Sequence, residues 1–299
     1  MNSAWSNNPV QPARYRAQDT RAAWLMLSPF LVFFVLFIAY PMVMSLYYSF
    51  TDYNLNTANF VGVRNYVRLT RDPVFGMAFQ NTCVYALISV SMLFVLGFLT
   101  AAVLNRSFRG VAGLRMLMLY PYATSMTAVS MIFLMLFDVN SGVLNKILRG
   151  IGAQPSNWLF DPGLALYCLI FVNVWKNIGY CMLIYLSGMQ TIDPALYEAA
   201  TVDGAGEGAR LIHITLPMLR PVALFVLITT MVDAFKTFEQ VQIMTRGDPL
   251  YTTTTIVHQI YQQGFSDFRM GYASAMAVVL LVVVMAFSAV GLRSNPSHA

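Results

Sequence analysis

Apolar residues are concentrated in six long stretches that are separated by shorter polar segments. The stretches cover about residues 24–49, 79–104, 114–138, 164–188, 221–244 and 271–292. Each contains at least ~20 residues, which is enough for a helix to cross a hydrocarbon layer of about 30 Å. Lipid offers no partners to bare backbone amides, so segments that cross it are expected to be helical. The pattern predicts an all-α membrane protein with six transmembrane helices.

Composition agrees with this class of protein. The 299 residues are 58% hydrophobic and 10% charged, with a mean hydropathy of +0.60, whereas soluble domains contain roughly 25% charged residues. The net charge of +5 does not indicate a nucleic-acid partner, because the basic residues are scattered at helix ends, where lipid head groups lie. The expected surroundings are a lipid bilayer.

An even number of spans places both termini on one side of the membrane. Nine Lys and Arg residues fall on the side of the termini and seven on the other, which favours cytoplasmic termini. The nine are Arg14, Arg16, Arg21, Arg106, Arg109, Arg115, Arg210, Arg220 and Arg293. We therefore expect a cytoplasmic tail at 1–23, a single membrane domain at 24–292 and a second cytoplasmic tail at 293–299.

The polar segments then alternate between the two sides of the membrane. Segments 105–113 and 189–220 are expected in the cytoplasm, and segments 50–78, 139–163 and 245–270 outside. Short amphipathic pieces at 61–69 and 142–148 are expected to lie along the membrane surface.

The long cytoplasmic segment at 189–220 predicts two short helices joined by a tight turn. Asp193 is a good N-cap, and Pro194 suits the first helical turn. Asp203 and Gly204 form the left-handed stop expected after a helix, and a second helix follows until Pro217. Such a compact pair fits a groove on a partner protein. An ordinary cytoplasmic helical hairpin explains these residues equally well on physical grounds.

A sequence motif in the same segment favours the first interpretation. Glu198-Ala199-Ala200 is followed by Gly204 and, after nine residues, by Ile214-Thr215-Leu216-Pro217. This spacing resembles the EAA loop of membrane subunits of binding-protein-dependent ABC importers, which couples an ATPase to the pore. The resemblance implies a cytoplasmic coupling-helix loop between the fourth and fifth spans. It implies ATPase-coupling roles for Glu198, Ala199, Ala200, Asp203, Gly204, Ile214, Leu216 and Pro217.

The resemblance extends over nearly all of residues 24–292. It includes Phe60 to Tyr66, Asp72 to Phe75, and Asn140 to Leu148 with Trp158-Leu159. These segments look like permeases of carbohydrate-type importers, in particular those for glycerol-3-phosphate and related sugars, which implies a bacterial inner-membrane location. The maltose permease differs, because it has extra leading spans and a large outer domain.

The resemblance also implies a set of partners: a second, similar permease, two ATPase subunits and an extracytoplasmic solute-binding protein. The sequence contains no Gly-x-x-x-x-Gly-Lys-Ser/Thr, the phosphate-binding loop of many ATPases. We therefore expect no cofactor in this chain, with ATP and Mg²⁺ bound by the partner ATPases.

Polar residues inside the fourth and fifth apolar stretches are the candidates for a solute pathway. Ionisable groups are costly in lipid unless they are paired or face water. The candidates are Asn173, Trp175, Lys176, Asn177, Tyr180, Asp233, Lys236, Glu239 and Gln240. Amides and charges suit a hydroxyl-rich solute, and aromatic rings could stack on a sugar. Pairing of the acids with the lysines between helices is the structural alternative, and charge does not choose between a neutral sugar and an anionic polyol.

Neither catalysis nor a metal site is expected. The three histidines, His213, His258 and His298, have no metalloprotease spacing, and no nucleophile elbow is present. The three cysteines, Cys83, Cys168 and Cys181, lie in apolar stretches without paired spacing and read as small apolar fillers. A stand-alone secondary transporter is the alternative function, although two related halves, common in that class, are not visible.

Overall fold

A computed structural model describes residues 17–293, and the tails expected at 1–23 and 293–299 lie largely outside this range. The secondary structure of the described residues is helical, apart from one isolated antiparallel bridge between Thr51 and Phe60. The chain divides into two compact units between Tyr47 and Tyr48. The prediction of a mostly helical membrane protein is confirmed.

The first unit is one long helical segment. It consists of α1 (Ala17–Phe34), the π-helical turn η1 (Val35–Ala39) and α2 (Tyr40–Tyr48), which extends to the unit boundary. Its apolar part, Ala22–Tyr48, contains 27 residues, long enough to cross a membrane. None of the most apolar part of this segment is buried, as expected of a helix in lipid.

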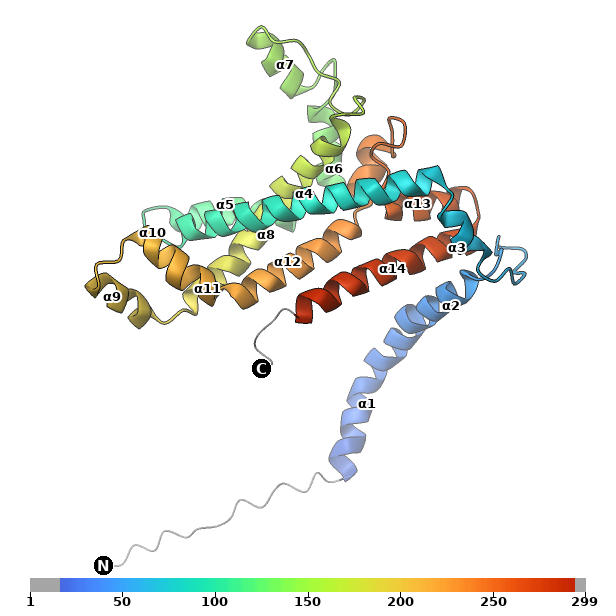
Figure 1. Cartoon of the computed structure of the whole chain (residues 1–299), viewed down its shortest axis with the longest axis horizontal. Helices are drawn as coiled ribbons and strands as arrows, with labels where there is room; N and C mark the ends of the chain where they lie inside the picture. The colour runs from blue at the N-terminus through green and yellow to red at the C-terminus, as the bar shows by residue number, and fades with distance from the viewer. Residues whose placement is uncertain (1–16, 294–299) are drawn as a thin grey trace, which may run out of the picture. The chain divides into compact units, whose positions relative to one another are not determined.

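The second unit contains the other helices (Figure 1). They are α3 (Arg64–Leu69), α4 (Pro73–Leu104), α5 (Val111–Ala123), α6 (Met126–Leu136), α7 (Val143–Gly150), α8 (Ala165–Gln190), α9 (Pro194–Val202), α10 (Glu207–Arg210), α11 (Leu216–Met218), α12 (Arg220–Phe235), α13 (Ile256–Tyr261) and α14 (Met270–Arg293). Three π-helical turns interrupt this order, namely η2 (Leu211–Thr215), η3 (Val241–Thr245) and η4 (Gln262–Ser266).

The described residues contain four uninterrupted helices that could cross a membrane, or up to six if each of two bent pairs is one span. Three of the four lie in the second unit: α4, α8 and the first 22 residues of α14. The third apolar stretch is not one straight helix, because α5 and α6 meet at a bend of 96°. The cause is local: Thr124 and Ser125 both have extended backbone conformations between the two helices.

The fifth apolar stretch also differs from the prediction of a helix over 221–244. Here α12 starts at Arg220, after a bend of 67° from the segment Glu207–Met218, and ends at Phe235. The polar residues from Lys236 onward leave the helix before the next helical turn begins. The helix predicted over 221–244 is therefore interrupted at residues 236–238, and the chain is helical again over 239–245.

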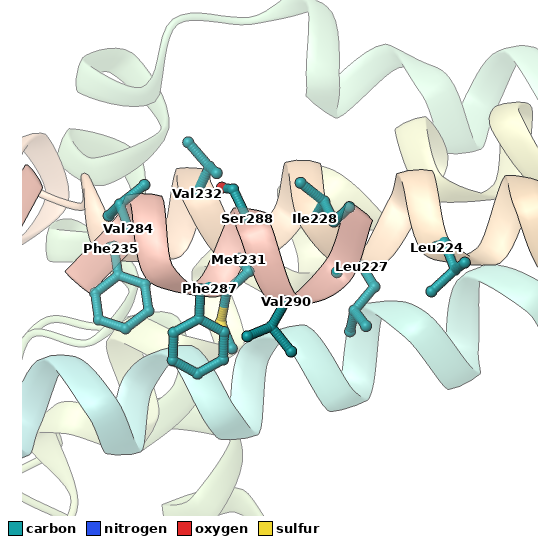
Figure 2. A pocket seen from close by; sticks show the side chains of 11 residues that line it. Leu224, Leu227, Ile228, Met231, Val232, Phe235, Val284, Phe287, Ser288 and Val290 are labelled. Carbon is teal, nitrogen blue, oxygen red and sulfur yellow. The ribbon is translucent and has the colours of Figure 1, made fainter. Parts of the chain in front are cut away.

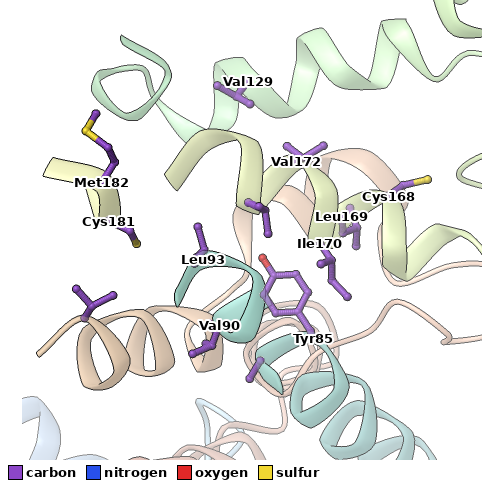
Figure 3. Close-up of a cluster of buried hydrophobic side chains, with 14 of the residues drawn as sticks. Tyr85, Val90, Leu93, Val129, Cys168, Leu169, Ile170, Val172, Cys181 and Met182 are labelled. Atoms are coloured by element: carbon purple, nitrogen blue, oxygen red, sulfur yellow. The ribbon is translucent and has the colours of Figure 1, made fainter. Parts of the chain in front are cut away.

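The core is built around the contact between α4 and α8, with α5 and α12 packed beside them. Tyr85 and Leu93 of α4 and Leu169 of α8 are among its buried side chains (Figure 3). The helices approach closely where Gly97 faces Cys181, because a Cβ on Gly97 would lie 2.6 Å from the Cys181 Cβ. Both Cys168 and Cys181 are buried and free, in agreement with their interpretation as fillers.

The start of α4 is held by a capping group that also joins two other helices. The Asp72 carboxylate accepts hydrogen bonds from the backbone N–H groups of Val74 and Phe75, as an N-cap does. Its other oxygen accepts a hydrogen bond of 2.7 Å from the Tyr272 hydroxyl on α14. The guanidinium of Arg68 on α3 lies 4.5 Å from the centre of the Tyr272 ring. One carboxylate thus fixes this end of α4 against α3 and α14.

The segment around α7 is organised by the fully buried Asn145. Its side chain donates to the carbonyls of Val139 and Ser156 and accepts from the Ser156 N–H and the Trp158 indole. Before this segment, Asp138 accepts hydrogen bonds from the backbone N–H and hydroxyl of Ser141, which lower the pKa of its carboxyl group. Helices are confirmed within both predicted amphipathic pieces, while their position at the membrane surface remains a prediction.

Gly179 provides a test of the packing of α8 against α5. A Cβ at this position would lie 1.9 Å from the Met118 carbonyl oxygen, so backbone would have to move. We expect Gly179→Ala to lower the free energy of unfolding by about 1–3 kcal/mol, which is the usual cost of overpacking. Gly113→Ala is the matched control, because no atom lies within 4 Å of its Cβ position. Thermal melting of the detergent-solubilised variants measures both; equal melting temperatures would contradict the close contact.

Candidate functional site

A polar cavity of about 530 Å³ opens between α6, α8 and the end of α12. Its volume lies within the range of small-molecule sites, about 300–1,000 Å³. It is lined by Met126, Asn173, Lys176, Asn177, Asp233, Lys236, Thr237, Phe238, Glu239 and Gln240. Seven of the nine solute-pathway candidates are therefore brought together in one cavity.

The α8 wall of the cavity carries three polar side chains at helical spacing. Asn173, Lys176 and Asn177 are three and four residues apart and so share one face of the helix. The Asn177 amide donates to the backbone and side-chain oxygens of Asn173, both at 2.9 Å. These bonds leave the Asn177 side-chain oxygen available as an acceptor.

Lys176 is the buried charge of this wall, with 8% of its surface exposed. Its ammonium donates a hydrogen bond of 3.1 Å to the carbonyl of Tyr122 and lies 5.1 Å from the centre of the Tyr122 ring. Tyr122 is in the last turn of α5, where carbonyl groups lack partners within the helix and attract cations. Lys176 therefore stabilises the end of α5 just before the 96° bend.

The opposite wall forms because α12 ends inside the apolar stretch. Asp233 is in its last turn, and Lys236 and Glu239 follow at spacings of three residues, all three exposed to the cavity side. Among residues 17–293 no ion pair joins either acid to Lys176 or Lys236. The ion pairs of the structural alternative are therefore not observed; Lys176 is instead bonded to Tyr122, and the Glu239 carboxylate accepts a hydrogen bond of 3.5 Å from the Thr127 hydroxyl.

Gln240 connects this wall to the core. Its amide nitrogen donates to the Tyr85 hydroxyl of α4 and, at 3.0 Å, to the Thr237 hydroxyl. The Thr237 carbonyl in turn accepts a hydrogen bond of 3.0 Å from Thr255, the N-cap of α13. Sequence reasoning missed Tyr85, Thr237 and Met126 as parts of the site. Only Tyr85 gave a signal in the sequence: its hydroxyl lies within an apolar helix, and a buried tyrosine hydroxyl requires a hydrogen-bond partner.

Two solute-pathway candidates do not line the cavity. Trp175 is 42% exposed and packs edge-on against Phe133, with ring centres 5.1 Å apart. Tyr180 stacks on Tyr122 at 4.7 Å. Trp175 is next to Lys176 in sequence, but one residue turns a helix by about 100°, so the two side chains leave on different faces. The amides and charges among the candidates thus line the cavity and the two rings do not, while a role of any of them in the solute pathway stays a prediction.

The segment between α8 and α12 has the two-helix geometry predicted for it. The Asp193 carboxylate accepts a hydrogen bond of 2.9 Å from the Ala195 N–H and caps α9. Gly204 has a φ of +79°, and the Ala205 and Gly204 N–H groups donate to the carbonyls of Ala200 and Thr201. This pair of bonds is the Schellman arrangement that ends helices at a left-handed glycine.

Contacts from several elements hold this two-helix segment in place. The Tyr197 hydroxyl lies 3.0 Å from the Thr215 hydroxyl, which joins α9 to η2. Arg106, just after α4, pairs with Glu207 of α10 at 2.5 Å. Leu219, at the end of the segment, is buried beside Gly188 of α8.

The same segment exposes several large apolar side chains. Val202 is 88% exposed, and four more large apolar side chains are exposed with it. These are Leu196, Ile212, Leu216 and Met218. The Glu198 carboxylate is exposed and forms no hydrogen bond or ion pair with other residues in the range 17–293. Exposed apolar side chains near a carboxylate without a partner are typical of an interaction surface.

Comparison with known proteins agrees with this geometry. The family of inner membrane components of binding-protein-dependent transport systems matches residues 93–296. The sulfoquinovosyl glycerol permease SmoG of Agrobacterium fabrum is 35% identical over 92% of this chain and 90% of the relative. The lactose permease LacF of Rhizobium radiobacter is 34% identical over 88% of this chain and 91% of the relative. The chain therefore belongs to this family, whose members are the permease subunits of ABC importers.

A solved structure extends the agreement to the fold. A chain of a bacterial alginate ABC transporter, crystallised with an alginate pentasaccharide-bound periplasmic protein, matches with a TM-score of 0.83. The sequence identity is 25%, over 93% of this chain and 96% of that one. The relatives are transporter permeases and not enzymes, and a stand-alone secondary transporter is not favoured.

Tyr85 provides a test of the wall that Gln240 forms. Tyr85→Phe removes an acceptor from the Gln240 amide, and an unsatisfied buried donor costs about 1–3 kcal/mol. We expect a lower melting temperature for this variant. Tyr185→Phe is the control, because the buried Tyr185 hydroxyl has no hydrogen-bond partner among the described residues and its loss should be neutral or stabilising. Equal losses in both variants would show that the Gln240 bond is unimportant.

Proposed function

We propose that this permease imports a sugar, glycoside or polyol-phosphate-type solute through the cavity between α8 and α12. The observation that supports this most strongly is the cluster of charges, none of them in an ion pair among residues 17–293, and amides on two apolar stretches of the chain. Carboxylates accept hydrogen bonds from hydroxyl groups, ammonium groups donate them, and amides do both. A solute with many hydroxyl groups forms hydrogen bonds with the carboxylates, the ammonium groups and the amides at once. An apolar solute forms none of these bonds.

The named solutes of relatives support the same class. They include sulfoquinovosyl glycerol, lactose, sn-glycerol-3-phosphate and alginate, all sugars, glycosides or polyol derivatives. In this proposal Asn173, Lys176 and Asn177 contact the solute from α8. Asp233, Lys236, Glu239 and Gln240 contact it from the opposite wall. Phe238, which also lines the cavity, is the aromatic face available for stacking on a sugar ring.

The proposed topology counts each bent helix pair as one span, which gives six spans with both termini in the cytoplasm. Two features support it. The helices α9 and α10 lie at one end of α4, and α3 lies at the other (Figure 1). The interaction surface on α9 to α11 thus faces one side of the membrane, and segments 50–78 and 245–270 face the other, where a binding protein would dock together with segment 139–163.

The proposed partners are a second similar permease, two ATPase subunits and the binding protein. The ATPases hold ATP and Mg²⁺, and their closure moves the segment Glu198–Pro217 as a rigid body. The contacts of Tyr197 with Thr215 and of Glu207 with Arg106 support rigid movement, because they connect this segment internally and to the end of α4. ATP then shifts the permease between two states by binding one of them more tightly.

The function is tested by purifying the tagged permease from its native membrane with whatever subunits accompany it. We expect a second permease and an ATPase, with ATP hydrolysis raised by a binding protein that carries a sugar or polyol derivative. Recovery of the permease without an ATPase, under conditions that preserve other ABC importers, would contradict the proposal.

Gly204 tests the coupling role. Its φ of +79° is unfavourable for other residues, so Gly204→Val should change the angle between α9 and α10. The strain of about 1–2 kcal/mol corresponds to roughly a tenfold shift between conformations. We expect roughly tenfold slower uptake, with ATP hydrolysis no longer raised by the loaded binding protein. Gly206→Val is the control, because Gly206 has a φ of −67° and open space at its Cβ position. Normal uptake by both variants would contradict the coupling assignment.

A further inference from the structure

A second cavity, unlike the first, is apolar. It is a groove of about 200 Å³ between α12 and α14 (Figure 2). Its lining is hydrocarbon except at Ser288, the single hydroxyl group. The lining residues are Leu224, Leu227, Ile228, Met231, Val232, Phe235, Val284, Phe287, Ser288, Val290 and Gly291. A polar solute or a nucleotide would find only the Ser288 hydroxyl as a side-chain hydrogen-bond partner here.

The groove is a slot with two contacts between the helices along it. A Cβ on Gly291 would lie 2.9 Å from the Ile228 side chain, so the helices touch there. Further along α12, the Phe235 and Phe287 rings lie 5.9 Å apart and close the end of the slot. The lining residues of α12 begin at Leu224, near the start of that helix.

Along α12, the lining of the groove extends over about the depth of one leaflet of a bilayer. Leu224 and Phe235 are eleven residues apart, which is about 17 Å along a helix at 1.5 Å per residue. Half of a hydrocarbon core of about 30 Å is about 15 Å. The α12 side of the groove is therefore long enough for the part of one extended acyl chain that lies in one leaflet.

A positive charge lies at the open end of the slot. Arg220 precedes Leu224 by four residues and continues the row formed by Leu224, Ile228 and Met231 on one face of α12. Its side chain is exposed and has no hydrogen-bond or ion-pair partner within the range 17–293. Arg220 directly follows the segment α9 to α11, so in the proposed topology it meets head groups of the cytoplasmic leaflet. Anionic lipids there attract Lys and Arg.

We propose that the groove between α12 and α14 binds one acyl chain of an anionic phospholipid of the cytoplasmic leaflet, with Arg220 holding the phosphate. The leaflet assignment rests on the proposed topology. The exposed positive charge of Arg220 near the Leu224 end of the groove favours an anionic lipid over an apolar helix from another subunit. The site would tie lipid to the start of α12, next to the coupling segment.

Native mass spectrometry of the purified complex tests this site with dioleoyl phosphatidylglycerol and dioleoyl phosphatidylcholine as probes. Arg220→Gln removes the anchor, and Ser288→Phe fills the slot, with Ser288→Leu as a smaller substitute if the first variant does not fold. We expect each to retain at least fivefold less phosphatidylglycerol than the unmodified complex. Arg220→Gln should leave the weaker retention of phosphatidylcholine unchanged.

Two controls separate a specific site from general contact with lipid. Arg109→Gln removes an exposed charge on the same proposed side of the membrane, and Val282→Phe enlarges an exposed position of α14 outside the groove. Both should retain phosphatidylglycerol normally. Unchanged retention in the Arg220 and Ser288 variants, or equal loss in all variants and controls, would overturn the proposal. Efficient disulfide cross-linking of Ser288→Cys to a helix of another subunit would also overturn it. Lipid retention is read without transport, so its failure is distinct from failure of the import function.

Discussion

The central constraint on this structure is that a helix ending within an apolar stretch must find partners for its last backbone groups. α12 ends in this way at Phe235, and the chain then continues through Lys236, Thr237 and Phe238. The Thr237 carbonyl is satisfied by the Thr255 hydroxyl, and the Phe238 carbonyl accepts from the Gln242 N–H. The same break turns charged side chains toward the cavity. The polar cavity is therefore a consequence of an interrupted helix.

The rigid part of the molecule surrounds this interruption. The α4–α8 pair forms a tightly packed support in which Gly97 and Gly179 permit close backbone contact with neighbouring helices. Tyr85 extends the support to the cavity wall through Gln240, and Lys176 extends it to the end of α5. Both walls of the cavity are thus attached to the same two helices. A solute in the cavity would contact side chains whose positions depend on this core.

The two-helix segment at 189–220 owes its shape to local rather than distant interactions. Its turn is specified locally, by the Asp193 cap and the left-handed Gly204, and needs few distant contacts. Several of its large apolar side chains remain exposed, among them Val202 at the end of α9. A segment whose shape is specified locally keeps that shape when its surroundings change. Together with its exposed apolar side chains, this suits the proposed transmission of movement between subunits.

The sequence by itself determined the membrane class, the helical content, the two-helix segment at 189–220 and the amides and charges of the cavity. These follow from local rules: apolar length, caps, left-handed glycine and helical spacing, none of which depends on distant residues. The family motif, also local, indicated the importer class that the comparisons support. Only the tertiary structure decided that α12 ends at Phe235, that the third stretch bends by 96°, and that Trp175 and Tyr180 pack against other rings. It also brought Tyr85 to Gln240, 155 residues away. Contacts between residues so far apart follow from packing, which periodicity along the chain does not encode.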